Sequence, residues 1–252
     1  MNETGGILWS IDENGVMRIA KSENGDGTIP VTPATGSEKE YNDEGYERTV
    51  FTFEGTFHKP WSYEEGERVT EVIIEPGITE IPFGTFSGFR RLVRITVPDS
   101  VRSIGKWAFR SCEELERIIL PEGIGDIGDE TFLGCDRLSG LSIPSGVTSI
   151  GKKAFSFCKS LTEIDLPEGL RYIGEEAFSF CGGLKKITIP DSVEFVGRDA
   201  FKSCGNLRKA YVPADKIDRF RNAFEKPNYY QNTGTTLVAK KGKSIFARLF
   251  KK

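Results

Sequence analysis

The sequence predicts an α/β, β-rich solenoid, in which short coils stack and share a parallel sheet. Three observations support this: a repeat of 23 residues, a short alternating apolar segment in each copy, and a proline that ends the segment. The cysteines show the period most clearly, at Cys112, Cys135, Cys158, Cys181 and Cys204. Because so short a unit cannot bury its apolar side chains alone, we expect each copy to be one coil of a stack.

Each part of the repeat predicts a part of the coil. In segments such as 163–167, apolar residues alternate as in a half-buried strand, and the following proline cannot donate to a sheet and ends the strand. The glycine after the next isoleucine predicts a tight bend. The AFxxC segment is long enough for about one helical turn. Further columns with the same period begin at Phe86, Leu92 and Pro98.

Residues 1–68 are predicted to be an N-terminal cap, which a solenoid needs at its open end. Asn14-Gly15 lies between two apolar runs and predicts a hairpin, so residues 7–19 are expected to pair as two strands. Residues 21–48 are rich in glycine, proline, serine, asparagine and acidic residues, which indicates a long, mobile, acidic loop.

The repeats are predicted to span residues 69–213 as six copies, followed by a helical cap over residues 214–231. Ile217, Phe220 and Phe224 have the spacing of an apolar helix face and predict a short helix that covers the last coil. Phe224 also falls on the phenylalanine column, and the sequence leaves open which role it takes.

The last segment, residues 232–252, contains six basic residues and no acidic one. Its end, SIFARLFKK, mixes apolar and basic residues. Residues 240–252 could therefore form a short amphipathic helix on an anionic membrane surface, or a frayed, solvated terminus.

The repeat unit, LxxIxIPxxVxxIGxxAFxxC, resembles the BspA-like leucine-rich repeats of bacterial surface proteins and some protist proteins. The resemblance covers residues 69–213 closely; residues 9–19 and 59–61 resemble the N-terminal cap of this family, and residues 211–224 resemble its C-terminal segment. Phe89 replaces the cysteine in the first coil. The resemblance implies a leucine-rich repeat solenoid that serves in adhesion or host interaction at a bacterial cell surface.

Composition and charge argue against several function classes. The chain has 252 residues, a net charge of −3 and no unbroken apolar run of membrane-spanning length, so no transmembrane span is predicted. Without a basic stripe outside the tail, we expect no nucleic-acid binding. The N-terminus has no basic start followed by an apolar run, so we expect a cytoplasmic location unless a leader was removed.

Few residues offer catalytic or metal chemistry. His58 is the single histidine, and no nucleophile or phosphate motif accompanies it, so we predict no enzyme and no cofactor. The cysteine column is interpreted as buried free thiols, with a disulfide or a zinc site as alternatives. Acidic residues recur after the proline, which is typical of solvated turns but also allows a calcium or glycosidase site; they are Asp99, Glu122, Glu168 and Asp191.

The functional prediction concerns the outward positions of the strands, which vary while their neighbours repeat. We predict that they bind a protein or glycan partner, as solenoids do through extended surfaces, with an acidic centre and basic ends. An intracellular protein-interaction scaffold is the alternative. The predicted partner-binding residues are Arg94, Arg117, Ile119, Glu163, Asp165, Lys186, Lys209 and Tyr211.

A second candidate surface consists of extra aromatic residues in the later repeats. Other repeats mostly carry small or polar residues at the same positions, so these rings could form an exposed anchor of the kind found at interface centres, or fill local gaps in the core. They are Phe157, Tyr172, Phe180 and Phe195.

Overall fold

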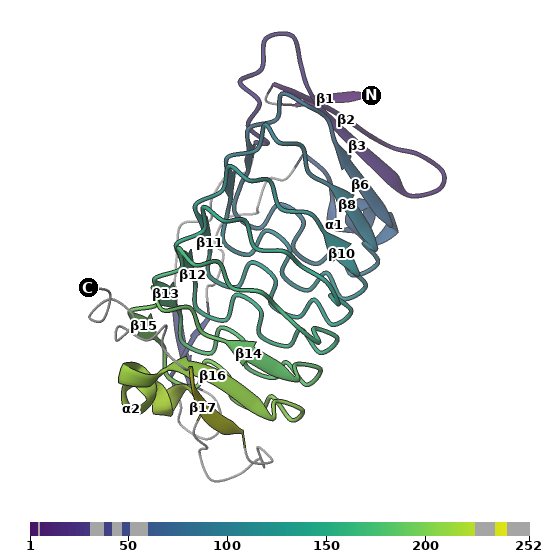
Figure 1. Cartoon of the computed structure of the whole chain (residues 1–252). Coiled ribbons are helices and arrows are strands. Elements are labelled where there is room, and N and C mark those ends of the chain that lie inside the picture. Colours follow the sequence, from purple (N-terminus) through teal and green to yellow (C-terminus); the bar gives the residue numbers. More distant parts are fainter. Residues whose placement is uncertain (5, 31–37, 42–46, 51–59, 225–234, 241–252) are drawn as a thin grey trace, which may run out of the picture.

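The computed structural model describes residues 1–4, 6–30, 38–41, 47–50, 60–224 and 235–240. It forms an elongated parallel-sheet solenoid of about seven turns with few helices, which confirms the predicted fold class (Figure 1). The N-terminal strands lie at one end of the solenoid and the short C-terminal helix lies at the other.

Parallel strands one period apart form one side of the solenoid, which we call the primary sheet. The repeats contribute β6 (Glu71–Ile74), β8 (Arg94–Thr96), β10 (Arg117–Ile118), β14 (Lys186–Thr188) and β16 (Lys209–Pro213). The coils between β10 and β14 continue it through single bridges, Arg117 with Gly140 and Ser142 with Asp165.

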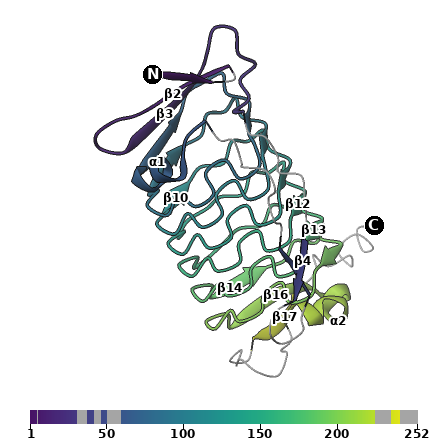
Figure 2. The same ribbon diagram turned by 180° about the vertical axis from the view of Figure 1, so that it is seen from behind.

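A second row of strands, which we did not predict, runs along the opposite side of the coils (Figures 1 and 2). Each strand has two residues and pairs in parallel within one of two groups: β7 with β9, and β11, β12, β13 and β15 in that order. The strands are β7 (Glu80–Ile81), β9 (Ser103–Ile104), β11 (Asp126–Ile127), β12 (Ser149–Ile150), β13 (Tyr172–Ile173) and β15 (Phe195–Val196).

A glycine follows each of these strands except β7, and it permits close stacking rather than a bend. Gly105, Gly151, Gly174 and Gly197 do not have positive φ angles. A Cβ added to Gly174 would instead lie 2.5 Å from the carbonyl carbon of Gly151, and one added to Gly197 would lie 2.4 Å from the backbone nitrogen of Glu175. A side chain here would therefore collide with the preceding coil.

The AFxxC segment is not the helical turn that we predicted. Two residues before and two residues after the phenylalanine, the backbone turns through left-handed conformations, with φ of 54° at Glu176 and 59° at Phe180. Between these turns the backbone hydrogen-bonds to the next coil: the Phe178 N–H donates to the carbonyl of Ala200 at 2.7 Å. The alternating backbone conformations direct N–H and C=O groups along the solenoid axis, toward adjacent coils. In a helical turn, the same groups would form hydrogen bonds within their own coil.

The phenylalanine column is the centre of the core. From Phe86 to Phe201, successive rings stack with centroids 5.2–5.6 Å apart, and all of them are fully buried. Trp61 stacks on Phe86 at 5.8 Å, and Phe224 stacks on Phe201 at 4.7 Å. Phe224 therefore continues the column, and one residue from each flank ends the stack.

The N-terminal strands join the primary sheet. The antiparallel hairpin of β2 (Ile7–Ile11) and β3 (Val16–Lys21) covers residues 7–19, as expected, and β3 pairs in parallel with β6. β1 (Asn2–Thr4) pairs with β2. A helix that we did not predict, α1 (Tyr63–Arg68), begins at a capping box in which the Glu65 N–H donates to the Ser62 hydroxyl.

Residues 21–48 contain more regular structure than the predicted loop. β4 (Glu38–Tyr41) and β5 (Glu47–Val50) pair antiparallel, and Thr28 bridges to Glu80 of β7. One whole strand and the start of a second therefore lie within a segment whose composition indicated a loop throughout.

The C-terminal cap combines helical turns and one further strand. η1 (Ala214–Lys216), α2 (Ile217–Phe220) and η2 (Arg221–Ala223) follow β16, and β17 (Thr236–Lys240) pairs with it in parallel. The tail segment thus begins as a sheet strand, while residues 241–252 lie outside the described residues. Every helix in the described part of the chain is too short or too polar to span a membrane.

Candidate functional site

Side chains alternate across the strands of the primary sheet, and this alternation determines which of them face solvent. In β8, Ile95 is buried while Arg94 and Thr96 on either side of it are exposed. Ile118 in β10 and Ile187 in β14 repeat the buried position. The outward positions therefore form two columns that run along the solenoid, one on each side of the buried isoleucines.

All the predicted partner-binding residues lie in these two columns, which we call the primary face. Tyr211 is half-buried, whereas Ile119 exposes 84% of its surface, a large value for an apolar side chain. The other positions are exposed and comprise Arg94, Arg117, Glu163, Asp165, Lys186 and Lys209.

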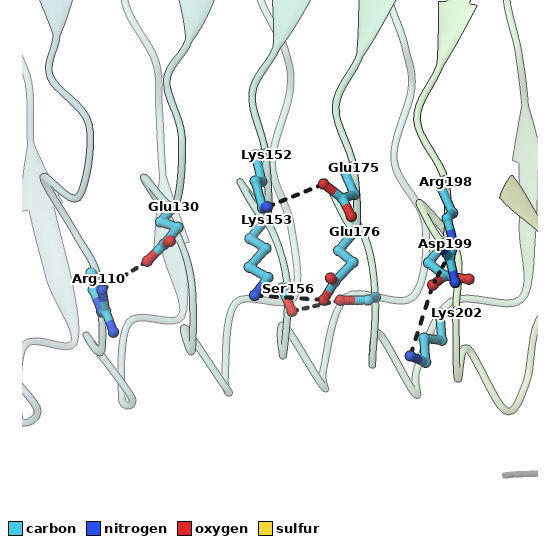
Figure 3. Close-up of polar contacts among 11 residues, drawn as sticks. Arg110, Glu130, Lys152, Lys153, Ser156, Glu175, Glu176, Arg198, Asp199 and Lys202 are labelled. Atoms are coloured by element: carbon cyan, nitrogen blue, oxygen red, sulfur yellow. Dashed lines mark hydrogen bonds and ion pairs between the residues drawn. The ribbon is translucent and has the colours of Figure 1, made fainter. Parts of the chain in front are cut away.

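Away from the primary face, many charged side chains pair with opposite charges one coil away. We call the segments that follow each strand of the second row, such as residues 151–162, the turn segments. Figure 3 shows ion pairs between them: Lys152 Nζ lies 3.1 Å from Glu175 Oε2, and Arg110 Nη1 lies 2.7 Å from Glu130 Oε2. Arg110 and Glu130 are 20 residues apart, whereas Lys152 and Glu175 are 23 apart. The other pairs with a spacing of 23 residues are Arg90–Glu113, Lys106–Asp129, Glu114–Arg137, Asp136–Lys159, Lys153–Glu176 and Arg171–Glu194.

These contacts shift the pKa values of some of the groups. Burial acts to raise the pKa of Asp129, but hydrogen bonds from the Lys106 side chain and the Lys152 N–H, with the charges of both lysines, lower it below the usual range. The hydrogen bond to Glu175 raises the pKa of Lys152. The turn segments therefore carry charges that already have partners within the protein.

Charges on the primary face are arranged differently. Arg94 pairs with Glu71 of the first coil at 2.9 Å, and the hydrogen bond to Glu71 raises the pKa of the guanidinium. Beyond this pair, the remaining predicted charges form no ion pair with any described residue; they are Arg117, Glu163, Asp165, Lys186 and Lys209. The primary face thus carries charges that are available to a partner.

The four extra aromatic rings form two separate pairs. Phe157 and Phe180 stack with centroids 4.5 Å apart in the turn segments, and Tyr172 and Phe195 stack at 5.0 Å on the second row of strands. Phe157, Tyr172 and Phe195 expose 40–45% of their surface, whereas Phe180 is half-buried. Among the described residues no ring contact joins the two pairs, so the rings line two sides of the coil.

The cysteine column consists of buried free thiols. Each sulfur donates to the carbonyl of the phenylalanine 26 residues earlier; for example, Cys158 Sγ lies 3.3 Å from the Phe132 oxygen. Burial raises the pKa of the Cys204 thiol to about 12 and raises that of Cys158 well above its usual value. The thiols therefore connect adjacent coils and remain protonated near neutral pH.

The structure adds two basic residues that we did not predict as site residues. Lys185 and Arg208 immediately precede Lys186 and Lys209, and all four side chains are exposed at the C-terminal end of the primary face. A signal was present in the sequence, because two basic residues recur at the same place in neighbouring repeats. We overlooked it because the prediction considered only the positions within the strands.

The remaining candidates from the sequence are His58, the acidic turn residues and possible metal ligands. His58 lies outside the described residues. Of the acidic turn residues, Asp191 pairs with Lys240 at 2.9 Å, which connects the end of β17 to the coil of β14, two strands away in the sheet. The described residues contain no group of three or more histidine, cysteine or acidic side chains that could hold a metal ion.

Comparison with known proteins agrees with this architecture. The family model for the BspA type leucine rich repeat region, with six copies, matches residues 61–163 and 148–250. None of the curated proteins compared with the chain matches it.

The chain is also similar to solved structures of bacterial proteins. A leucine-rich repeat protein from Bacteroides ovatus is 27% identical with a TM-score of 0.54, and the similarity covers 84% of this chain and 47% of that one. A leucine-rich repeat protein from T. pallidum is 21% identical with a TM-score of 0.41, with coverage of 85% and 72%. The chain thus spans about half the length of the Bacteroides ovatus protein.

Proposed function

Because the chain belongs to the BspA-type leucine-rich repeat family, we propose that it is a non-enzymatic module that binds a protein partner through the primary face. The observation that carries this proposal is the distribution of ion pairs. Charges in the turn segments are paired between coils, whereas Arg117, Glu163 and Asp165 form no ion pair with a described residue. These three charges can therefore form ion pairs with a bound protein without breaking an ion pair to a described residue.

The composition of the primary face suits protein recognition. Ile119 supplies an exposed apolar side chain beside Arg117, and Gly140 and Ser142 in the next coil are small. Alternating basic and acidic areas restrict the orientation of a bound protein and increase its rate of association more than its affinity. The partner should therefore present basic groups opposite Asp165 and acidic groups opposite Arg117.

Adhesion at a bacterial cell surface is the setting that the family resemblance favours, and an intracellular scaffold is the alternative. The five free thiols do not distinguish the two, because buried, protonated thiols are stable in either redox environment. Fractionation of the native cells, followed by detection of the protein in surface and cytoplasmic fractions, separates the two settings.

The binding proposal is tested with two charge-swapped variants that keep the net charge unchanged. Arg117→Glu with Asp165→Lys reverses two charges on the primary face. Lys152→Glu with Glu175→Lys is the matched control, because it reverses an ion pair in the turn segments and preserves the pairing. The immobilised full chains are used to capture proteins from surface extracts, and the captured proteins are identified by mass spectrometry.

We expect the wild-type chain and the control to capture the same partner and the face variant to lose it. A photo-crosslinking residue at position 119 should link that partner directly. The proposal is wrong if the face variant captures the partner as well as the control does, or if the crosslinks form only at sites outside the primary face.

A further inference from the structure

Four exposed basic residues lie on two adjacent coils at the C-terminal end of the primary face, two of them within its columns and two immediately before them. Lys186 of β14 is in register with Lys209 of β16, and the Arg208 N–H donates to the Lys185 carbonyl at 3.1 Å. All four side chains are exposed. Because neighbouring strands lie about 4.8 Å apart, two basic residues in one coil stand directly beside two in the next. We call this group, Lys185, Lys186, Arg208 and Lys209, the basic corner.

The basic corner is unfavourable for folding. Like charges directly opposite each other in a sheet destabilise it, and no described acidic side chain forms an ion pair with Lys185, Lys186 or Lys209. The nearest acidic residue in the column of Lys186 is Glu163, one coil earlier. Elsewhere the same period brings opposite charges together. Fold stability therefore does not explain the cluster, whereas binding of an anion would offset the repulsion.

The geometry indicates the kind of anion. In an extended polypeptide, side chains on one side repeat about every 6.6 Å, whereas the coils advance by about 4.8 Å. Each pyranose unit lengthens a glycan chain by a distance close to the spacing between successive coils. A glycan running along the solenoid axis would therefore keep its charged groups in step with successive coils, whereas an acidic peptide would not.

Neighbouring side chains suit a carbohydrate. In the same two coils, two residues further along each strand, Thr188 is in register with Tyr211. Their hydroxyls can donate to or accept from sugar hydroxyls, and the half-buried Tyr211 ring offers an apolar surface to a sugar ring. Cations, hydroxyls and an aromatic ring therefore lie together on adjacent strands.

We propose that the basic corner binds an anionic, sulfated glycan whose chain runs along the solenoid axis. The proposal goes beyond protein binding by the primary face and can fail separately from it. The glycan places its sulfate groups against the basic corner and its ring faces toward Tyr211.

The test uses a size-defined heparin oligosaccharide, its desulfated counterpart, and polyglutamate of similar charge. The wild-type full chain is compared with a variant in which Lys185, Lys186, Arg208 and Lys209 are all replaced by glutamine. A control removes four positive charges that have partners one coil away; it carries glutamine at Lys106, Lys152, Lys153 and Lys159. Affinities are measured by calorimetry, and thermal melts establish that each variant is folded.

We expect the corner variant to bind the sulfated oligosaccharide at least roughly tenfold more weakly than wild type, and the control to stay within about twofold, because only the corner contacts the anion. Binding should weaken with added salt. Tyr211→Phe and Tyr211→Ala should weaken it further in that order. Three results would overturn the proposal: no binding by the wild type, equal losses in both variants, or tighter binding of polyglutamate, which would indicate an acidic protein ligand instead.

Discussion

At the scale of single residues, the repeat places chemically reactive groups where they cannot react. The cysteines are fully buried, and each donates to a phenylalanine carbonyl of the preceding coil. The period alone predicted that these thiols would be buried and free. What it could not indicate was the carbonyl acceptor, because that contact depends on how adjacent coils are offset.

Because the thiols are buried, we expect the stability of the fold to depend on pH in the alkaline range. Burial raises the pKa of Cys204 to about 12, above the ordinary value of 9.0. A raised folded-state pKa contributes stability that is complete below the unfolded value and is lost as pH rises toward the folded value. We therefore expect the melting temperature of the wild type to fall as pH rises from about 8 to about 11, with a shallower fall for Cys204→Ser.

Serine is the informative replacement because it keeps a donor for the Phe178 carbonyl but does not titrate in this range. Cys204→Ala serves as the control that lacks both the donor and the titration. Melts followed by circular dichroism give the three slopes, and equal slopes in all three proteins would contradict the prediction.

At the scale of elements, each coil is held by contacts that a periodic sequence shows only in part. The alternation in segments such as 163–167 predicted the primary sheet. The second row escaped prediction because two residues are too few to show an alternating pattern. The turn segments were misread as helical because Glu176 and Phe180 adopt positive φ without being glycine. β17 lies where the 23-residue period has ended, so nothing in the repeat indicated it.

The stacking glycines allow a direct test of how closely the coils approach. Gly174→Ala should lower stability by about 1–3 kcal/mol, because its Cβ would lie 2.5 Å from the backbone of the preceding coil. Gly125→Ala is the matched control, since a Cβ at that position meets nothing within 4 Å. Urea unfolding of both variants measures the difference. If Gly125→Ala lowered stability as much as Gly174→Ala does, the loss would come from replacing glycine itself and not from the close spacing of the coils.

At the scale of the whole molecule, the solenoid is a one-dimensional stack in which each coil contacts mainly its neighbours. Its core is a ring column closed by Trp61 and Phe224, and its sides carry different charges. The sequence could predict the candidate face, since its positions vary between repeats. That five charges of this face, on Arg117, Glu163, Asp165, Lys186 and Lys209, form no ion pair with a described residue depends on side-chain distances and required the structure. Sequence variation shows where the surface differs between repeats, and the structure shows which charges of that surface have no described partner.

A stack of this kind should respond differently to damage at its centre and at its end. Phe155 has a stacked ring on both sides, at 5.3 and 5.2 Å, whereas Phe224 has a described stacking partner only in Phe201. Phe155→Ala should cost about 3–5 kcal/mol and increase hydrogen exchange in the coils on both sides, because the cavity interrupts the column. Phe224→Ala should increase exchange mainly in the last coil and α2, with a smaller drop in melting temperature, because fraying at an end leaves the other interfaces intact. If Phe224→Ala instead raised exchange throughout the chain, the solenoid would be a single cooperative unit, and the nearest-neighbour description would be wrong.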